Sequence, residues 1–292
     1  MGKYVYKNEE SMKKIHAFYD KAMDQLNVKY RELYIETTYG NTHILIVGDE
    51  NKPSIITLHG GNGISPLNIR LFLPLLENFC IIAPDVIGMP GKSEPYRNLD
   101  TNKDDYAIWI SEIMDSLHIC KGMFAVSSYS AAMAFSLAKK HPERIEKCVL
   151  LVPSGIAHGP IIPMMWKMAV PFMKYYFKPS HKSLDSVMDT MVSEGDDLWR
   201  EFLDLMMSSY KMEMRAPKEF SKKELKNFQS PILLFASDED IFFPASKVFP
   251  RAKRIFKGPV HTYEVTGKHL PSKEKMNFVC DKISEFCKQD NL

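Results

Sequence analysis

The chain has 292 residues, of which 45% are hydrophobic and 25% are charged, and its formal net charge is +2. These proportions are ordinary for a folded protein and exclude a disordered or collagen-like chain. A net charge so near zero provides no general field that would favour nucleic acid or an anionic membrane. No apolar run approaches the roughly 18 residues needed to span a bilayer, and the polar N-terminus lacks the apolar core of a secretory signal.

The cysteine pattern bears on the cellular compartment. The chain has five cysteines, and no two of them have the CxxC spacing. Cys80, Cys120 and Cys148 lie in or beside apolar runs that are typical of buried strands. An odd, scattered set disfavours a disulfide framework or a zinc site and favours a reducing, cytoplasmic compartment. No phosphate-binding loop and no dinucleotide motif occurs, so we expect no cofactor and no metal.

The N-terminal part predicts a helix followed by a hairpin. Apolar residues recur at helical spacing over residues 8–26. Residues 31–37 and 42–48 then alternate as strands around the turn at Tyr39, Gly40 and Asn41.

Short apolar runs alternate with helical patterns from Pro53 to Val152 and again from Pro231 onward. The expected strands are residues 54–58, 79–83, 122–127, 147–152, 232–236 and 260–265. The expected helices are residues 66–77, 102–118, 129–140, 245–254 and 272–288. Such alternation indicates parallel βαβ units, and therefore an α/β protein whose mostly parallel sheet carries helices on both faces.

The alternation is interrupted over residues 155–228, which have helical periodicity but no convincing strand. We therefore expect one α/β core formed by residues 1–154 and 229–292, with helix 8–26 packed on it and a helical insertion between the two pieces. The insertion is rich in Met and aromatic residues, and such a stripe usually serves packing. If the insertion covers a binding site, some of these side chains should line a lipophilic acyl pocket. Pro171 predicts a kink or break in this region.

A candidate nucleophile lies where strand 122–127 meets the next helix. A sharp strand–turn–helix exposes the side chain of the turn residue beside the N–H groups of the helix. Ser127, Ser128 and Ser130 compete for this position. Small neighbours are needed two residues before and after the nucleophile, and local sterics slightly favour Ser130.

At this point the chain resembles the α/β-hydrolase family. In that family a helix ending in a motif like His141-Pro142-Glu143-Arg144-Ile145 follows the nucleophile, and a spacing of about 13 residues from nucleophile to that His implies Ser128. Ser130 stays as the alternative. Val126 departs from the family pattern, because a glycine normally stands two residues before the nucleophile.

The resemblance also implies the partners of the nucleophile, which follow it in the order acid, then histidine. The implied acid is Asp240, in a loop similar to the family's G-x-x-D-x-x-x-P with Ser237 in place of the glycine, and Asp238 is its competitor. The implied base is His269, just before the terminal helix. The other histidines are expected to be surface or capping residues: His16, His43, His118, His141, His158, His181 and His261.

Two backbone N–H groups should form an oxyanion hole. The sequence His59-Gly60-Gly61-Asn62-Gly63 matches the family's HG-x-x-G loop, which implies a donor at Gly61. The second donor is the amide of Tyr129. The turn from Asp85 to Ser93 resembles a structural turn of the family.

The resemblance thus implies an α/β-hydrolase fold with an inserted helical cap, similar to bacterial carboxylesterase-like members. The expected activity is that of a serine carboxylesterase acting on small or medium lipophilic carboxylic esters. Two alternatives stay open: hydrolysis of a lactone, amide or C–C bond, and a non-catalytic ligand-binding relative. We expect a small-molecule ester as substrate, no nucleic acid and no membrane span, and the sequence does not indicate an oligomeric state.

Overall fold

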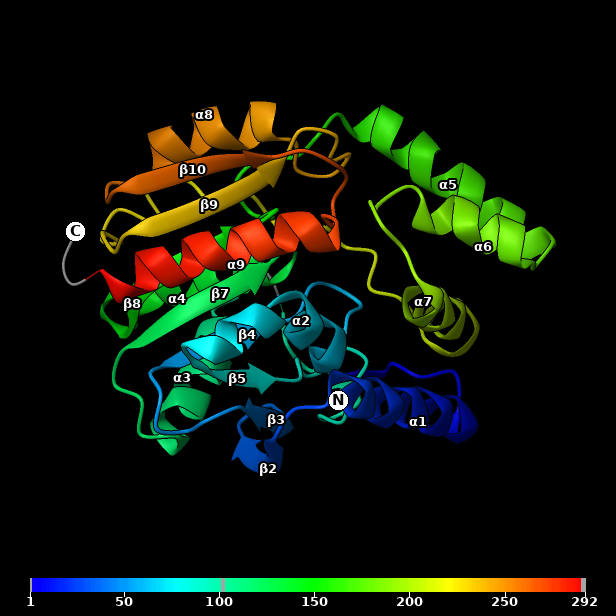
Figure 1. Ribbon diagram of the computed structural model, residues 1–292, viewed down its shortest axis with the longest axis horizontal. Helices are drawn as coiled ribbons and strands as arrows, with labels where there is room; N and C mark the ends of the chain where they lie inside the picture. Colours follow the sequence, from blue (N-terminus) through cyan, green and yellow to red (C-terminus); the bar gives the residue numbers. More distant parts are fainter. Residues whose placement is uncertain (1, 101–102, 290–292) are drawn as a thin grey trace.

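The computed structural model describes residues 2–100 and 103–289 and is built around an eight-stranded sheet with the strand order β10-β9-β8-β7-β4-β5-β3-β2 (Figure 1). Its strands are β2 (Tyr30–Thr37), β3 (Gly40–Val47), β4 (Ser54–Leu58), β5 (Cys80–Pro84), β7 (Gly122–Ser127), β8 (Ile145–Leu151), β9 (Ile232–Ser237) and β10 (Val260–Val265). β3 pairs antiparallel with both β2 and β5, and all other neighbours in this sheet are parallel. The predicted α/β class is confirmed.

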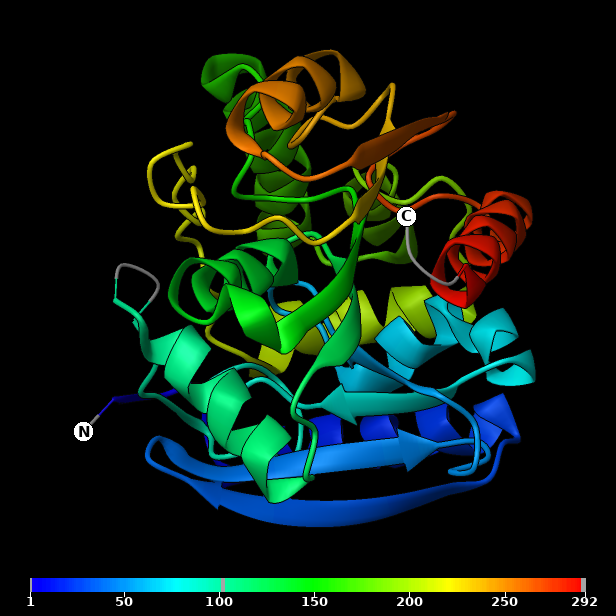
Figure 2. The same ribbon diagram turned by 90° about the vertical axis from the view of Figure 1, so that its left-hand side faces the viewer.

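Helices cover both faces of this sheet (Figure 2). One face carries α3 (Asp105–Ser116), α4 (Ser130–Lys140) and α8 (Ala245–Ile255). The other face carries α1 (Glu9–Leu26), α2 (Ser65–Leu71) and α9 (Lys273–Lys288). Two hydrophobic cores result, one on each face, because the parallel strands bury side chains on both of their sides.

Several predicted bounds change. The helix predicted at 66–77 is α2 followed by a 3-10 helix, η1 (Leu73–Glu77), because Pro74 cannot donate to a continuing α-helix. The hairpin turns at Thr38 and Tyr39, since Thr37 pairs with Gly40. Two short strands that were not predicted, β1 (Lys3–Tyr4) and β6 (Tyr96–Arg97), pair antiparallel, and a second 3-10 helix, η2 (Pro142–Arg144), precedes β8. Residue 102 of the predicted helix 102–118, and residues 1 and 290–292 of the predicted core, lie outside the described residues.

Three helices lie between β8 and β9, beyond one end of the sheet (Figure 1). They are α5 (Ile161–Phe177), α6 (His181–Met188) and α7 (Asp197–Ser209). Of the kink or break predicted near Pro171, the break is wrong, since α5 continues through this residue. α7 packs on α1, where the rings of Phe18 and Phe202 stack with centroids 5.7 Å apart. Helix α1 therefore contacts both the sheet domain and the inserted helices.

The packing expected for the Met and aromatic stripe fails along one side of α5. Trp166, Tyr176 and Phe177 are 65%, 79% and 81% exposed. Tyr175 is buried on the opposite side of the same helix. Only one side of α5 therefore serves the packing that the sequence suggests. Among the described helices, none is both long and apolar enough to cross a membrane.

Candidate active site

Ser128 occupies the sharp turn between β7 and α4. Its φ is +53°, in the left-handed region that few non-glycine residues adopt. Three backbone hydrogen bonds fix this conformation: the Ser128 N–H donates to Leu151 O at 2.9 Å, and the Ser128 carbonyl accepts from Ser154 at 3.0 Å and from Ala131 at 3.1 Å. Strain held in this way is typical of functional sites. The turn forms although Val126, which is fully buried in β7, stands where the family has glycine.

The two competing serines face elsewhere. Ser130 is fully buried, and its Oγ lies 2.7 Å from the carbonyl oxygen of Leu58. The Ser127 hydroxyl donates to Asn68 Oδ1 at 3.0 Å. Both side chains thus satisfy their hydrogen bonds inside the sheet domain.

His269 and Asp240 meet Ser128 from two loops at the same end of the sheet. His269 Nε2 lies 2.8 Å from Ser128 Oγ, and its Nδ1 lies 2.8 Å from Asp240 Oδ2. Asp240 is 3% exposed, and its other oxygen accepts the N–H of Phe242 at 2.8 Å. The Phe242 ring also packs against the imidazole, with centroids 5.0 Å apart. Serine, imidazole and carboxylate therefore form one continuous chain of hydrogen bonds.

The side chain of Asp238, the competing acid, accepts hydrogen bonds from the backbone of the loop that carries His269. Its Oδ1 accepts the N–H groups of Gly267 at 2.8 Å and of Glu239 at 2.9 Å, and the residue is exposed. On the far side of the loop, the Leu270 N–H donates to Met191 O at 2.7 Å. The loop that carries the imidazole is thus fixed from both sides.

The glycine loop after β4 lies directly against the turn that carries Ser128. A Cβ atom on Gly60 would lie 3.4 Å from the Ser128 Cβ, which is ordinary contact, whereas one on Gly61 would lie only 3.0 Å from the Tyr129 ring, so position 61 favours glycine. Within the described part of the chain, the amides of Gly61 and Tyr129 donate no hydrogen bond to protein. Two such free donors beside a serine suit a developing oxyanion. Burial raises the pKa of Tyr129 to about 12, so its phenol is neutral at pH 7.

Asn62 connects this glycine loop to the chain after α7. Its side-chain amide donates to the carbonyl of Glu213 at 2.9 Å, and its Oδ1 accepts the Glu213 N–H at 2.6 Å. Asn62 itself has a φ of +57°. The sequence shows Asn62 only as the variable position of the HG-x-x-G motif, and nothing in the sequence identifies its partner 151 residues away.

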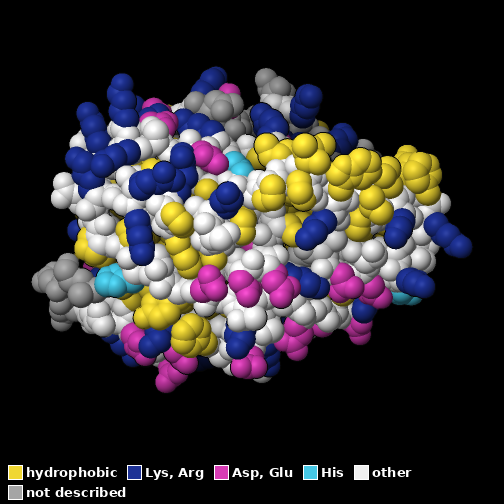
Figure 3. All heavy atoms as spheres, turned by 90° about the horizontal axis from the view of Figure 1, so that it is seen from above, with side chains coloured by type: hydrophobic (Ala, Val, Ile, Leu, Met, Phe, Trp, Pro, Cys, Tyr) yellow, Lys and Arg dark blue, Asp and Glu magenta, His cyan; other side chains and the backbone are white. Residues whose placement is uncertain are grey.

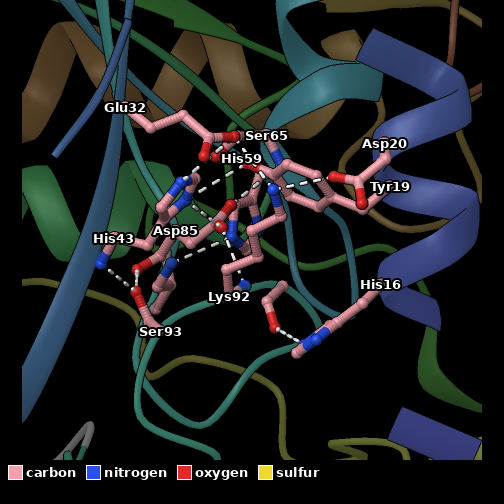
Figure 4. A network of polar contacts seen from close by, with 12 residues as sticks. His16, Tyr19, Asp20, Glu32, His43, His59, Ser65, Asp85, Lys92 and Ser93 are labelled. Atoms are coloured by element: carbon pink, nitrogen blue, oxygen red, sulfur yellow. Dashed lines mark hydrogen bonds and ion pairs between the residues drawn. The ribbon is translucent and has the colours of Figure 1, made fainter. Parts of the chain in front are cut away.

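A buried polar network lies behind the glycine loop (Figure 4). His43 was expected to be a surface or capping residue, and this is wrong: it is fully buried and its Nδ1 lies 2.9 Å from Asp85 Oδ2. His59 Nε2 accepts the N–H of Val86 at 3.0 Å, and burial lowers the pKa of His59. A buried histidine in an otherwise apolar strand next to an aspartate turn is the signal that could have found this pair. Among the described residues, no cluster of His, Cys, Asp or Glu could hold a metal ion.

The mostly parallel sheet, the sharp turn at Ser128 and the helices between β8 and β9 together define a protein with the α/β-hydrolase fold. A family model described as alpha/beta hydrolase fold matches residues 53–192. Carboxylesterase YbfK of Bacillus subtilis strain 168 is 26% identical over 286 residues, which cover 95% of this chain and 94% of that protein. Its crystal structure superimposes with a TM-score of 0.79, covering 97% of this chain and all of that one. The naproxen esterase of Bacillus subtilis has the same fold, with a TM-score of 0.77 at 20% identity, covering 94% and 97% of the two chains.

Proposed function

We propose that this chain is a serine hydrolase that cleaves small or medium lipophilic carboxylic esters through an acyl-enzyme. The observation that carries the proposal is the hydrogen-bonded series Ser128–His269–Asp240, with both of its contacts at 2.8 Å. Similarity to carboxylesterases over nearly the whole length of the chain supports ester hydrolysis.

The geometry supports a two-stage reaction. Ser128 Oγ attacks the ester carbonyl while His269 Nε2 takes its proton, and Asp240 holds the imidazole in the tautomer that can accept it. The amides of Gly61 and Tyr129 stabilise the negative oxygen of the tetrahedral intermediate, and each such donor is worth about 10²- to 10³-fold in kcat. His269 then protonates the leaving alcohol, which leaves an acyl group on Ser128.

The second stage releases the acid. His269 deprotonates a water molecule that attacks the acyl carbonyl, and the Ser128 oxygen leaves with the proton that returns from the imidazole. No metal or cofactor takes part in this scheme. A small-molecule ester is the proposed substrate, and the scattered cysteines support a reducing, cytoplasmic location.

We propose further that residues 155–228 act as a cap on the core formed by residues 1–154 and 229–292. Two contacts support this role. Val192 pairs with Leu270, the residue after the catalytic histidine, and Glu213 is bonded to Asn62 of the glycine loop. The insertion therefore touches the loops on both sides of Ser128.

A fluorophosphonate probe with peptide mapping tests the proposal. We expect labelling at Ser128, and Ser128→Ala should lose both the label and p-nitrophenyl butyrate hydrolysis, a loss of about 10⁶-fold in kcat. Ser130→Ala is the matched control: it removes a buried hydrogen bond, which costs about 1–3 kcal/mol of stability, but should keep the label at Ser128.

Two outcomes would contradict this assignment. Labelling at Ser130 would transfer the nucleophile to that residue. A folded wild-type protein that stays unlabelled would support the non-catalytic, ligand-binding alternative. A panel of lactone, amide and C–C substrates, assayed beside the ester, separates the remaining alternatives, because bond specificity depends on the pocket rather than on the triad.

A further inference from the structure

The outer face of α5 is the largest continuous set of exposed apolar side chains on the inserted helices. It consists of Ile161, Ile162, Met165, Trp166, Val170, Met173, Tyr176 and Phe177. Figure 3 shows apolar side chains gathered on this side of the molecule. We call this set the α5 face. Contiguous apolar patches of this kind mark interaction surfaces rather than ordinary protein surface.

Helical spacing places the exposed and the buried side chains of α5 on opposite sides of the helix. The α5 face follows the i, i+4, i+8 pattern from Ile161 and Ile162, whereas Pro171 and Tyr175 point to the opposite side and are buried. The helix is thus apolar around most of its circumference, and the side that carries Tyr175 packs against α6 and α7. Trp166 and Tyr176 are of the residue types that favour the boundary between water and hydrocarbon.

The charged side chains carried by α5 and by the turn that follows it are all lysines. Lys167, Lys174, Lys178 and Lys182 are all exposed. Among the described residues, none of these four has an ion-pair partner, in contrast to Lys139, which pairs with Asp104 at 2.8 Å. The sequence contains no Asp or Glu from Lys147 to Leu184. The net charge of the whole chain, +2, conceals this local excess.

The lysines distinguish a second copy of the chain from a lipid surface as the occupant of this face. A second copy of the chain packed symmetrically on this face would bring the same lysines together, because a twofold interface joins like patches. Like charges at close range oppose such a dimer. An anionic surface instead attracts every lysine while its hydrocarbon accepts the aromatic side chains.

We propose that the α5 face docks the protein on the surface of an anionic lipid bilayer. The helix lies in the plane of the interface, with Trp166 and Phe177 inserted below the headgroups and Lys174 and Lys178 beside the lipid phosphates. Docking is peripheral, and it does not depend on turnover at Ser128. Binding can therefore be measured separately from the proposed esterase activity.

Cosedimentation with vesicles tests this proposal. We expect the protein to bind vesicles that contain phosphatidylglycerol and to bind pure phosphatidylcholine vesicles far more weakly. Each lysine near an anionic bilayer strengthens binding about fivefold, so Lys174→Glu with Lys178→Glu should weaken it at least about 25-fold. Lys222→Glu with Lys223→Glu makes the same change in net charge at two exposed lysines outside the α5 face and should leave binding unchanged.

A second pair of variants removes the apolar part. Trp166→Ser with Phe177→Ser should abolish vesicle binding, whereas Tyr34→Ser, which removes a 57% exposed aromatic from edge strand β2, should not. An unchanged circular dichroism spectrum and melting temperature show that each variant is folded. Three results would overturn the proposal: equal binding to both vesicle types, equal loss in the two lysine pairs, or an α5-face variant that converts a dimer to a monomer in solution while vesicle binding is absent.

Discussion

Two aspartates after β9 differ by two positions, yet only one can orient the imidazole. Asp240 is buried and lies 2.8 Å from His269 Nδ1, whereas Asp238 is exposed and accepts backbone N–H groups. A carboxylate in the position of Asp240 fixes the tautomer that leaves Nε2 free to accept the serine proton. An amide can donate to Nδ1 and reverse that tautomer.

The first prediction compares these two residues by the same substitution. Asp240→Asn should lower kcat for p-nitrophenyl butyrate by about 10⁴-fold without unfolding the protein, because the favoured tautomer is lost. Asp238→Asn retains an oxygen that can accept from Gly267, and its kcat should stay near the wild-type value. Equal losses in the two variants would show that the acid is misassigned.

At the scale of elements, the important contact joins the glycine loop to the chain after α7. Asn62 lies next to Gly61, and its two hydrogen bonds to the Glu213 backbone fix the loop that presents the proposed oxyanion donor. The left-handed φ of +57° is itself compatible with asparagine or glycine. Conformation and tethering can therefore be separated by choice of substitution.

Two substitutions of Asn62 distinguish the effect of its side-chain hydrogen bonds from the effect of its backbone conformation. Asn62→Gly keeps the left-handed conformation but removes both side-chain hydrogen bonds, and we expect kcat to fall about 10- to 100-fold, since small misplacements of a catalytic group cost that much. Asn62→Ala loses the bonds and also strains the backbone, so it should lower the melting temperature more than Asn62→Gly does. If Asn62→Gly keeps wild-type kcat, the tether does not position the oxyanion donor.

At the scale of the whole molecule, the order of strands and helices follows from the sequence because each parallel strand is a short apolar run and each helix has its own periodicity. Ser128, His269 and Asp240 could be proposed because the resemblance to the α/β-hydrolase family implies their order and spacing, and because each follows a predicted strand of the sheet. Contacts between distant segments could not be predicted, as Asn62 with Glu213 shows, since no local pattern encodes a partner. The exposure of Trp166 could not be predicted for a related reason, because periodicity identifies an apolar face of a helix but does not show whether another element covers it.

The buried network around Asp85 shows how such distant contacts unite the molecule (Figure 4). Asp85 contacts His43 of β3, and it accepts the N–H groups of Lys92 at 3.0 Å and of Ser65 at 3.3 Å. The ammonium of Lys92 in turn pairs with Asp20 of α1 at 2.7 Å. Asp85 thus joins the sheet to the start of α2, and Lys92 joins the same turn to helix α1.

The pKa of Asp85 lies below its ordinary value. Burial acts to raise it, but the hydrogen bond and charge of His43 and the N–H of Lys92 outweigh burial. A carboxyl group whose pKa is lower in the folded than in the unfolded protein stabilises the fold. The stabilisation is fully present above the unfolded pKa, which is about 3.9 for Asp, and it is lost as the pH falls through the lower pKa of the folded protein. The network should therefore be fully effective at pH 7 and weaken only in acid.

The lowered pKa of Asp85 predicts how the stability of an Asp85 variant depends on pH. At pH 7, Asp85→Asn should lower the free energy of unfolding by about 1–3 kcal/mol, because the amide leaves part of a buried charged hydrogen-bond network unsatisfied. Asp24→Asn, at an exposed position of α1, should change it by less than about 0.5 kcal/mol. In urea unfolding measured at successively lower pH, the difference between wild type and Asp85→Asn should stay constant down to about pH 4 and then shrink. A difference that grows in acid would mean that Asp85 is protonated in the folded protein, and the network would then owe its stability to neutral hydrogen bonds rather than to a buried carboxylate.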